Sequence, residues 1–179
     1  MKVISLASVR GAPGVTTTAI LLASTFTDAL VVEADLDGGV LAVRYGLGRE
    51  PGLTTFAADG PDADGGWRAH AQDAGGVPVL VGPDAPAAST SVWRTAGERI
   101  THKLVAADGV AIVDAGRLRS PVPIVAASDL LAVFVNPVAD QLVALTHLVP
   151  TLRQAVRGRV AVVLVGDGPY GVEDVERAV

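Results

Sequence analysis

Short apolar runs alternate with longer segments in which apolar residues recur at helical spacing. The runs have the length of buried strands and lie at residues 3–7, 30–34, 77–81, 110–113, 130–135 and 159–165. The segments between them predict helices at residues 16–26, 90–107, 121–127, 140–156 and 172–178. Because alternating strands and helices favour parallel strands covered on both sides, the pattern predicts an α/β protein with a doubly wound, mostly parallel sheet and helices on both faces.

The remaining parts of the sequence give weaker indications of secondary structure. Residues 57–76 are rich in Asp, Gly, Ala and Pro and predict a loop with a short helix near Trp67. Pro150 is expected to kink or split the helix that contains it. No repeat or linker divides the chain, so residues 1–179 are expected to form one domain. The sequence ends where a doubly wound sheet ordinarily continues, so we expect a following strand to be missing at the C-terminus.

Composition narrows the classes of function. Half of the residues are hydrophobic, which supplies a core, and the net charge of −5 disfavours a protein that coats nucleic acid. The absence of cysteine excludes disulfides, thiolate metal sites and thiol catalysis, and fits a cytoplasmic protein. The apolar runs are far shorter than the roughly 20 residues of a membrane-spanning helix, so no membrane segment is expected.

A glycine-containing loop joins the first predicted strand to the first predicted helix. Its residues, predicted to bind the phosphates of a nucleotide, are Arg10, Gly11, Ala12, Pro13, Gly14, Val15, Thr16 and Thr17. Glycines let backbone N–H groups turn toward an anion, and the positive end of the helix points at the same place. An ordinary turn that happens to contain glycines is the alternative, but the position between first strand and first helix favours a phosphate loop.

Three aspartates follow predicted strands. Asp35 and Asp37 come after the second strand, on a segment expected to be extended, so that both side chains point the same way. Asp114 ends the strand at residues 110–113. We predict that Asp35, Asp114 and Thr16 hold Mg²⁺ and that Asp37 takes part in catalysis by orienting water. Each aspartate alone is equally well explained as a turn residue, but their combination with the loop, in this order, favours the functional interpretation.

These motifs, in this order, resemble those of the MinD/ParA group of phosphate-loop ATPases, which dimerise around ATP and position other machinery in bacterial cells. The group's loop reads Lys-Gly-Gly-x-Gly-Lys-Thr-Thr. Arg10 stands at its first lysine and Val15 at its second, whereas both threonines are kept. The two aspartates after the second strand match the group's Asp-x-Asp, and Asp114 matches its acidic strand-end residue. The likeness extends over residues 2–165, including a glycine turn, a short helix and Gly-Leu within residues 37–47.

Val15 is the main departure from the group. The lysine it replaces supplies positive charge to the β and γ phosphates, and valine has neither charge nor donor. Loss of one such electrostatic partner typically lowers the rate by about 10²–10³. Arg10 keeps the charge of the first lysine and adds a bidentate fork.

Three hypotheses of function follow. The favoured one is a positioning, partitioning or scaffolding protein with a degenerate nucleotide site, which binds ATP or ADP with Mg²⁺ and hydrolyses ATP weakly or not at all. Its partners would be proteins of a positioning, secretion or division apparatus, with a homodimer as the assembly that the resemblance implies. The second is an active, ATP-dependent dimerising ATPase that uses an arginine such as Arg10, Arg44 or Arg117 in place of the lysine. The third is a flavodoxin-like phosphate-binding module with no role for Asp114.

The histidines and tryptophans give no evidence of a functional site. His70, His102 and His147 fit no metal spacing and are expected to be surface or hydrogen-bonded histidines. Trp67 and Trp93 are expected to pack in the core.

Overall fold

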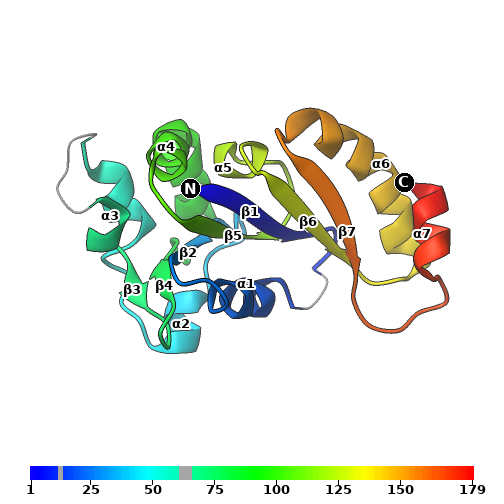
Figure 1. Cartoon of the computed structure of the whole chain (residues 1–179), viewed down its shortest axis with the longest axis horizontal. Helices are drawn as coiled ribbons and strands as arrows, with labels where there is room; N and C mark the ends of the chain where they lie inside the picture. Colours follow the sequence, from blue (N-terminus) through cyan, green and yellow to red (C-terminus); the bar gives the residue numbers. More distant parts are fainter. Residues whose placement is uncertain (12–13, 61–65) are drawn as a thin grey trace.

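The computed structural model describes residues 1–11, 14–60 and 66–179. Within these residues a seven-stranded sheet has the order β3-β4-β2-β5-β1-β6-β7 (Figure 1). Its strands are β1 (Lys2–Ser8), β2 (Ala29–Glu33), β3 (Gln72–Asp73), β4 (Pro78–Leu80), β5 (Val110–Arg117), β6 (Leu130–Val135) and β7 (Arg159–Leu164). Neighbouring strands are parallel except for β3, which runs antiparallel to β4. The predicted mostly parallel sheet is confirmed.

Helices cover both faces of the sheet, as predicted. They are α1 (Val15–Ala23), α2 (Leu41–Tyr45), α3 (Leu53–Ala58), α4 (Pro86–Ala106), α5 (Pro123–Ala126), α6 (Ala139–Ala155) and α7 (Val172–Ala178), with a 3₁₀ turn η1 (Gly66–Ala69). Figure 1 shows α1 and α2 below the sheet and α4, α5 and α6 above it. Each face has its own hydrophobic core, and the upper core contains both Trp67 and Trp93, as expected from the sequence.

Several boundaries differ from the sequence prediction. The segment expected to be a loop begins inside α3 and also holds β3, both too short to show a clear period. The helix expected to end at Phe26 stops at Ala23, where the hydroxyls of Ser24 and Thr25 donate to the carbonyls of Leu21 and Leu22. These local bonds compete with further helical turns.

Pro150 does not split its helix, because α6 runs unbroken from Ala139 to Ala155. The proline is exposed, so the helical hydrogen bond that it lacks is not a buried one.

β5 continues four residues past its predicted end. It pairs Asp114 with Glu33 of β2 and Arg117 with Ser8 of β1. The carboxyl ends of β1, β2 and β5 therefore meet at one edge of the sheet, where ligands of open α/β sheets bind. No helix among the described residues is long and apolar enough to cross a membrane.

Candidate functional site

A cavity of about 320 Å³ opens where these three strands end. Its lining residues are Ser8, Gly11, Gly14, Val15, Thr16, Thr17, Asp35, Asp37, Arg44, Gly116 and Arg117. The structure thus brings the loop and the two aspartates of the second strand together. Ala12 and Pro13 lie outside the described residues, and Arg10 is exposed and is not among the lining residues.

The described parts of the loop, on either side of residues 12 and 13, have backbone features of an anion site. Gly11 and Gly14 adopt positive φ angles of 75° and 101°, which residues other than glycine rarely adopt. Gly14 is the N-cap of α1, and no side chain of the described residues caps the helix there. The first N–H groups of α1 therefore remain available to a ligand, at the end of the helix where its dipole favours negative charge.

Val15 lines the cavity without contributing charge. Val15 is 5% exposed and packs in the core between α1 and the sheet. Valine there fills space against the sheet, and the anion site receives no cation from this position.

Thr16 and Asp114, the predicted Mg²⁺ ligands, lie near each other beside the loop. Asp114 is 2% exposed, and the Gly116 N–H donates to its Oδ1 at 3.1 Å. Burial raises the pKa of Asp114, and the Thr16 side chain, the Gly116 N–H and the charge of Arg44 oppose this rise. A hydroxyl and a carboxylate suit Mg²⁺, which takes few protein ligands and completes its shell with phosphate and water. Among the described residues no group of three acidic or histidine side chains could enclose a metal alone.

Asp35 and Asp37 lie in a turn and not, as predicted, on an extended segment. The Asp37 N–H donates to Asp35 Oδ1 at 2.8 Å, and the Gly38 N–H donates to the Asp35 carbonyl at 3.3 Å. Gly38, with φ of 104°, makes this turn possible. The Asp37 carboxylate is also paired with Arg119 at 2.8 Å, so the two aspartates have different surroundings although both line the cavity.

The surroundings of Asp35 destabilise the charged form of its carboxylate. Burial raises its pKa to about 6, and the charges of Asp114 and Asp37 add to this, whereas the Asp37 N–H and Arg117 oppose it. Its carboxylate lies against Gly116, where an added Cβ would overlap Asp35 Oδ2, and Gly116 has a φ of 54°. Both features favour glycine at position 116.

We expect Asp35→Asn to stabilise the metal-free protein above pH 6. The native pKa of about 6 exceeds the ordinary value of 3.8, so the folded protein binds the extra proton between these values and loses stability as the pH rises through them. Because Asp35 is partly exposed, solvent screening reduces the effect, and we expect the free energy of unfolding to rise by about 1 kcal/mol and Tm by about 3 °C. Thermal unfolding from pH 4 to 8 would show a higher Tm at pH 8 and a flatter profile. An unchanged profile, equal to that of the exposed control Asp140→Asn, would contradict this.

Sequence reasoning missed Glu33. This buried residue at the end of β2 accepts N–H bonds from Val40 at 2.5 Å, Leu41 at 2.8 Å and Gly82 at 2.9 Å. Burial raises the pKa of Glu33, and the three backbone bonds oppose it. Glu33 thereby fixes both ends of the loop that carries Asp35 and Asp37. An acidic residue closing an apolar run was the only signal in the sequence.

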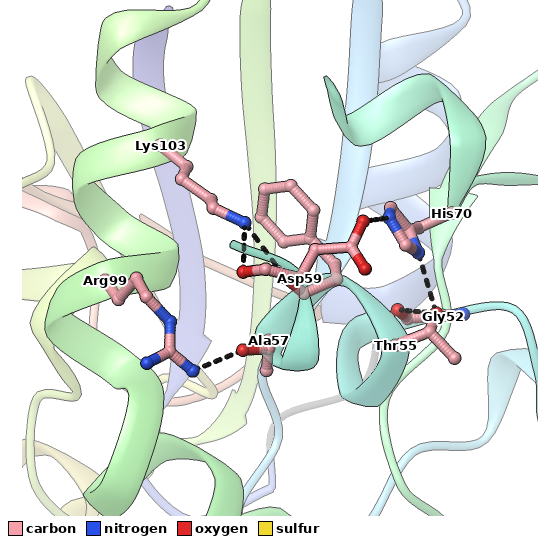
Figure 2. A network of polar contacts seen from close by, with 8 residues as sticks. Gly52, Thr55, Ala57, Asp59, His70, Arg99 and Lys103 are labelled. Carbon is pink, nitrogen blue, oxygen red and sulfur yellow. Dashed lines mark hydrogen bonds and ion pairs between the residues drawn. The ribbon is translucent and has the colours of Figure 1, made fainter. Parts of the chain in front are cut away.

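A second polar network lies at the far edge of the sheet (Figure 2). His70 contacts Asp59 Oδ2 through Nε2 at 2.6 Å and Thr55 Oγ1 through Nδ1 at 2.8 Å. The three residue types suggest a hydrolytic triad, but the Thr55 hydroxyl donates to the Gly52 carbonyl at 2.9 Å, within its own helix end. Lys103 donates to the Asp59 carbonyl at 2.9 Å. The network caps α3 at both ends, and the expectation of a hydrogen-bonded His70 is confirmed; His102 and His147 are exposed.

No protein-family model matches the sequence, and no curated protein matches it significantly. Solved structures do match. A ParA-family ATPase from Chlorobium tepidum TLS is 17% identical, with 99% of this chain and 79% of that chain covered and a TM-score of 0.77. The septum site-determining protein MinD from Pyrococcus horikoshii OT3, complexed with Mg-ADP, is 17% identical with coverages of 99% and 76% and a TM-score of 0.71.

The MinC:MinD cell division protein complex from Aquifex aeolicus gives a similar result. It is 17% identical, with coverages of 99% and 77% and a TM-score of 0.68. The fold is therefore the phosphate-loop fold of the MinD and ParA proteins, as the sequence motifs predicted. At this identity the comparison concerns the fold alone.

Proposed function

We propose that the chain binds ATP or ADP with Mg²⁺ in the cavity at the end of β1 and acts as a positioning, partitioning or scaffolding protein with weak or no ATP hydrolysis. The nearness of Thr16 to the buried Asp114, beside an uncapped helix end, supports nucleotide and Mg²⁺ binding. The Mg-ADP complex of Pyrococcus MinD, which has the same fold, adds to this support. The residues that would hold Mg²⁺ are Thr16 and Asp114, with Asp35 nearby in the cavity.

The proposal of weak ATP hydrolysis rests on the valine at position 15. Its buried side chain occupies the position from which lysine would neutralise the β and γ phosphates. Charge that develops in the transition state is then stabilised less, by about 10²–10³ in rate. The backbone N–H groups of the loop remain to hold the ground state.

We extend the proposal to partners by analogy. A protein of this fold in Aquifex aeolicus is solved in complex with MinC. We propose protein partners of a division, secretion or similar positioning apparatus, a homodimer, and a cytoplasmic location.

An active ATPase is the second candidate function. The observation that favours it is the presence of Arg44 and Arg117 in the cavity lining, where either would place positive charge near bound phosphate. A flavodoxin-like module is less well supported, because it gives no role to the buried Asp114 near Thr16.

Calorimetric titration of ATP–Mg²⁺, with phosphate release measured on the same sample, tests the proposed function. We expect saturable binding that weakens when EDTA removes Mg²⁺, and release close to the background rate. Thr16→Val is expected to reduce the Mg²⁺ dependence because it removes one ligand. Steady turnover at a rate typical of enzymes, about 1 s⁻¹ or faster, would favour the active ATPase, and no binding at all would exclude both readings.

A further inference from the structure

Arg117, the last residue of β5, lies over the phosphate loop. Its Nη2 is 3.1 Å from the point where a Cβ on Gly11 would stand, so the guanidinium rests against the bare backbone of that glycine. Both residues line the cavity. The guanidinium therefore brings positive charge to the cavity wall beside Gly11.

The backbone beneath Arg117 is tied firmly to β1. The Leu118 N–H donates to the Ser8 carbonyl at 2.9 Å, and the Ser8 hydroxyl donates to the Gly116 carbonyl at 3.3 Å. The same hydroxyl accepts the Gly11 N–H at 3.2 Å, which joins the loop to the end of β5 through one side chain. The arginine and the loop are therefore held in register before any ligand arrives, and less ordering is needed on binding.

Arg117 has no carboxylate within ion-pair distance in the described part of the chain. By contrast, the nearby Arg119 is paired with Asp37 at 2.8 Å. Arg44 is also unpaired among the described residues, and its charge lowers the pKa of Asp114 just as the charge of Arg117 lowers the pKa of Asp35. The two arginines differ at the loop, where the atoms nearest to a Cβ on Gly11 all belong to Arg117. Arg10 does not line the cavity. Within residues 1–11, 14–60 and 66–179, Arg117 thus combines contact with the loop backbone and a guanidinium that forms no ion pair.

We propose that Arg117 is the cation that binds the phosphates of the nucleotide, and that it takes over within the same chain the binding role for which Val15 has no charge. The proposal rests on the proposed function and deepens it by naming the group that recognises the polyphosphate. A guanidinium can donate two parallel hydrogen bonds to phosphate oxygens, which a lysine cannot. Because it approaches from β5 and not from α1, it holds the phosphates from the opposite wall of the cavity.

The test is calorimetric titration of ADP–Mg²⁺ and of inorganic pyrophosphate into wild type, Arg117→Ala, Arg117→Lys and Arg94→Ala. Loss of a charged hydrogen-bond donor is expected to weaken binding of both ligands about 10- to 100-fold in Arg117→Ala. Arg117→Lys should recover part of the affinity, since it keeps the charge and loses the fork. Arg94 is exposed on α4, so its removal changes the net charge equally and should leave the affinity unchanged.

The outcomes separate the two proposals. If wild type binds ADP–Mg²⁺ and Arg117→Ala binds it equally well, the role of Arg117 is wrong and the proposed function stands. If neither wild type nor a variant with lysine at position 15 binds nucleotide, the proposed function itself fails. Arg117 is exposed, so Arg117→Ala should unfold at the wild-type temperature. A reduced affinity that accompanies a large fall in Tm would assign the residue to the fold and overturn the proposal.

Discussion

Val15→Lys is expected to bind ATP–Mg²⁺ about 10- to 100-fold more tightly than wild type. The substitution returns a charged donor to a loop whose glycine conformations and uncapped helix end are already in place. The aliphatic part of lysine can take the apolar place of valine while its ammonium group reaches the cavity. Calorimetric titration at fixed ionic strength measures the gain, and phosphate release shows whether hydrolysis rises with it.

Two controls make this result specific. Val15→Met adds length without charge and should bind as wild type does. In the double variant Val15→Lys with Arg117→Ala, the loss caused by removing Arg117 should be smaller than in wild type, because the two cations would serve the same phosphates. If Val15→Lys folds normally but binds no more tightly, the loop does not present its N–H groups to phosphate.

Glu33→Ala is expected to lower the free energy of unfolding by about 3 kcal/mol, or Tm by about 6–12 °C. The variant leaves the N–H groups of Val40, Leu41 and Gly82 without their acceptor in a buried place. Removing the acceptor costs more than the desolvation of the carboxylate that it spares, because three donors are orphaned together. Thermal and urea unfolding measure the loss.

Glu33→Gln is the matched variant for this prediction. It keeps one carbonyl oxygen for the two N–H groups at α2 and turns an amide donor toward Gly82 or away from it, so an intermediate loss is expected. Glu98→Ala, on the exposed face of α4, should be nearly neutral. A loss in Glu33→Ala of less than about 1 kcal/mol would mean that an ordered water replaces the carboxylate as acceptor, as buried waters do at other polar sites.

The alternation of apolar runs and helical segments was sufficient to predict the sheet, because strands such as β6 are buried on both faces and read as continuous apolar sequence. β3 and α3 were missed because two and six residues give too little periodicity. The loop, Thr16 and Asp114 were predicted from motifs, since phosphate chemistry constrains their order along the chain.

The remainder of the site depends on register. Whether Arg117 reaches the cavity is decided by how far β5 extends and by its pairing with Ser8, which no local pattern encodes. The turn at Asp35 depends likewise on Gly38 and on the bonds that Glu33 makes to residues far along the chain. Long-range hydrogen bonds of this kind appear only when the strands are placed.

β1 is the first strand of the chain, yet it lies inside the sheet between β5 and β6. Its register joins Lys2 to Val110 and Ile4 to Leu130, contacts of long sequence separation that slow folding. During synthesis the phosphate loop is therefore made before β5 and stays without its far wall until β5 follows. A fragment that ends before Arg117 would have the loop sequence without this wall of the cavity, so ligand capture requires β5 although the loop is made before it.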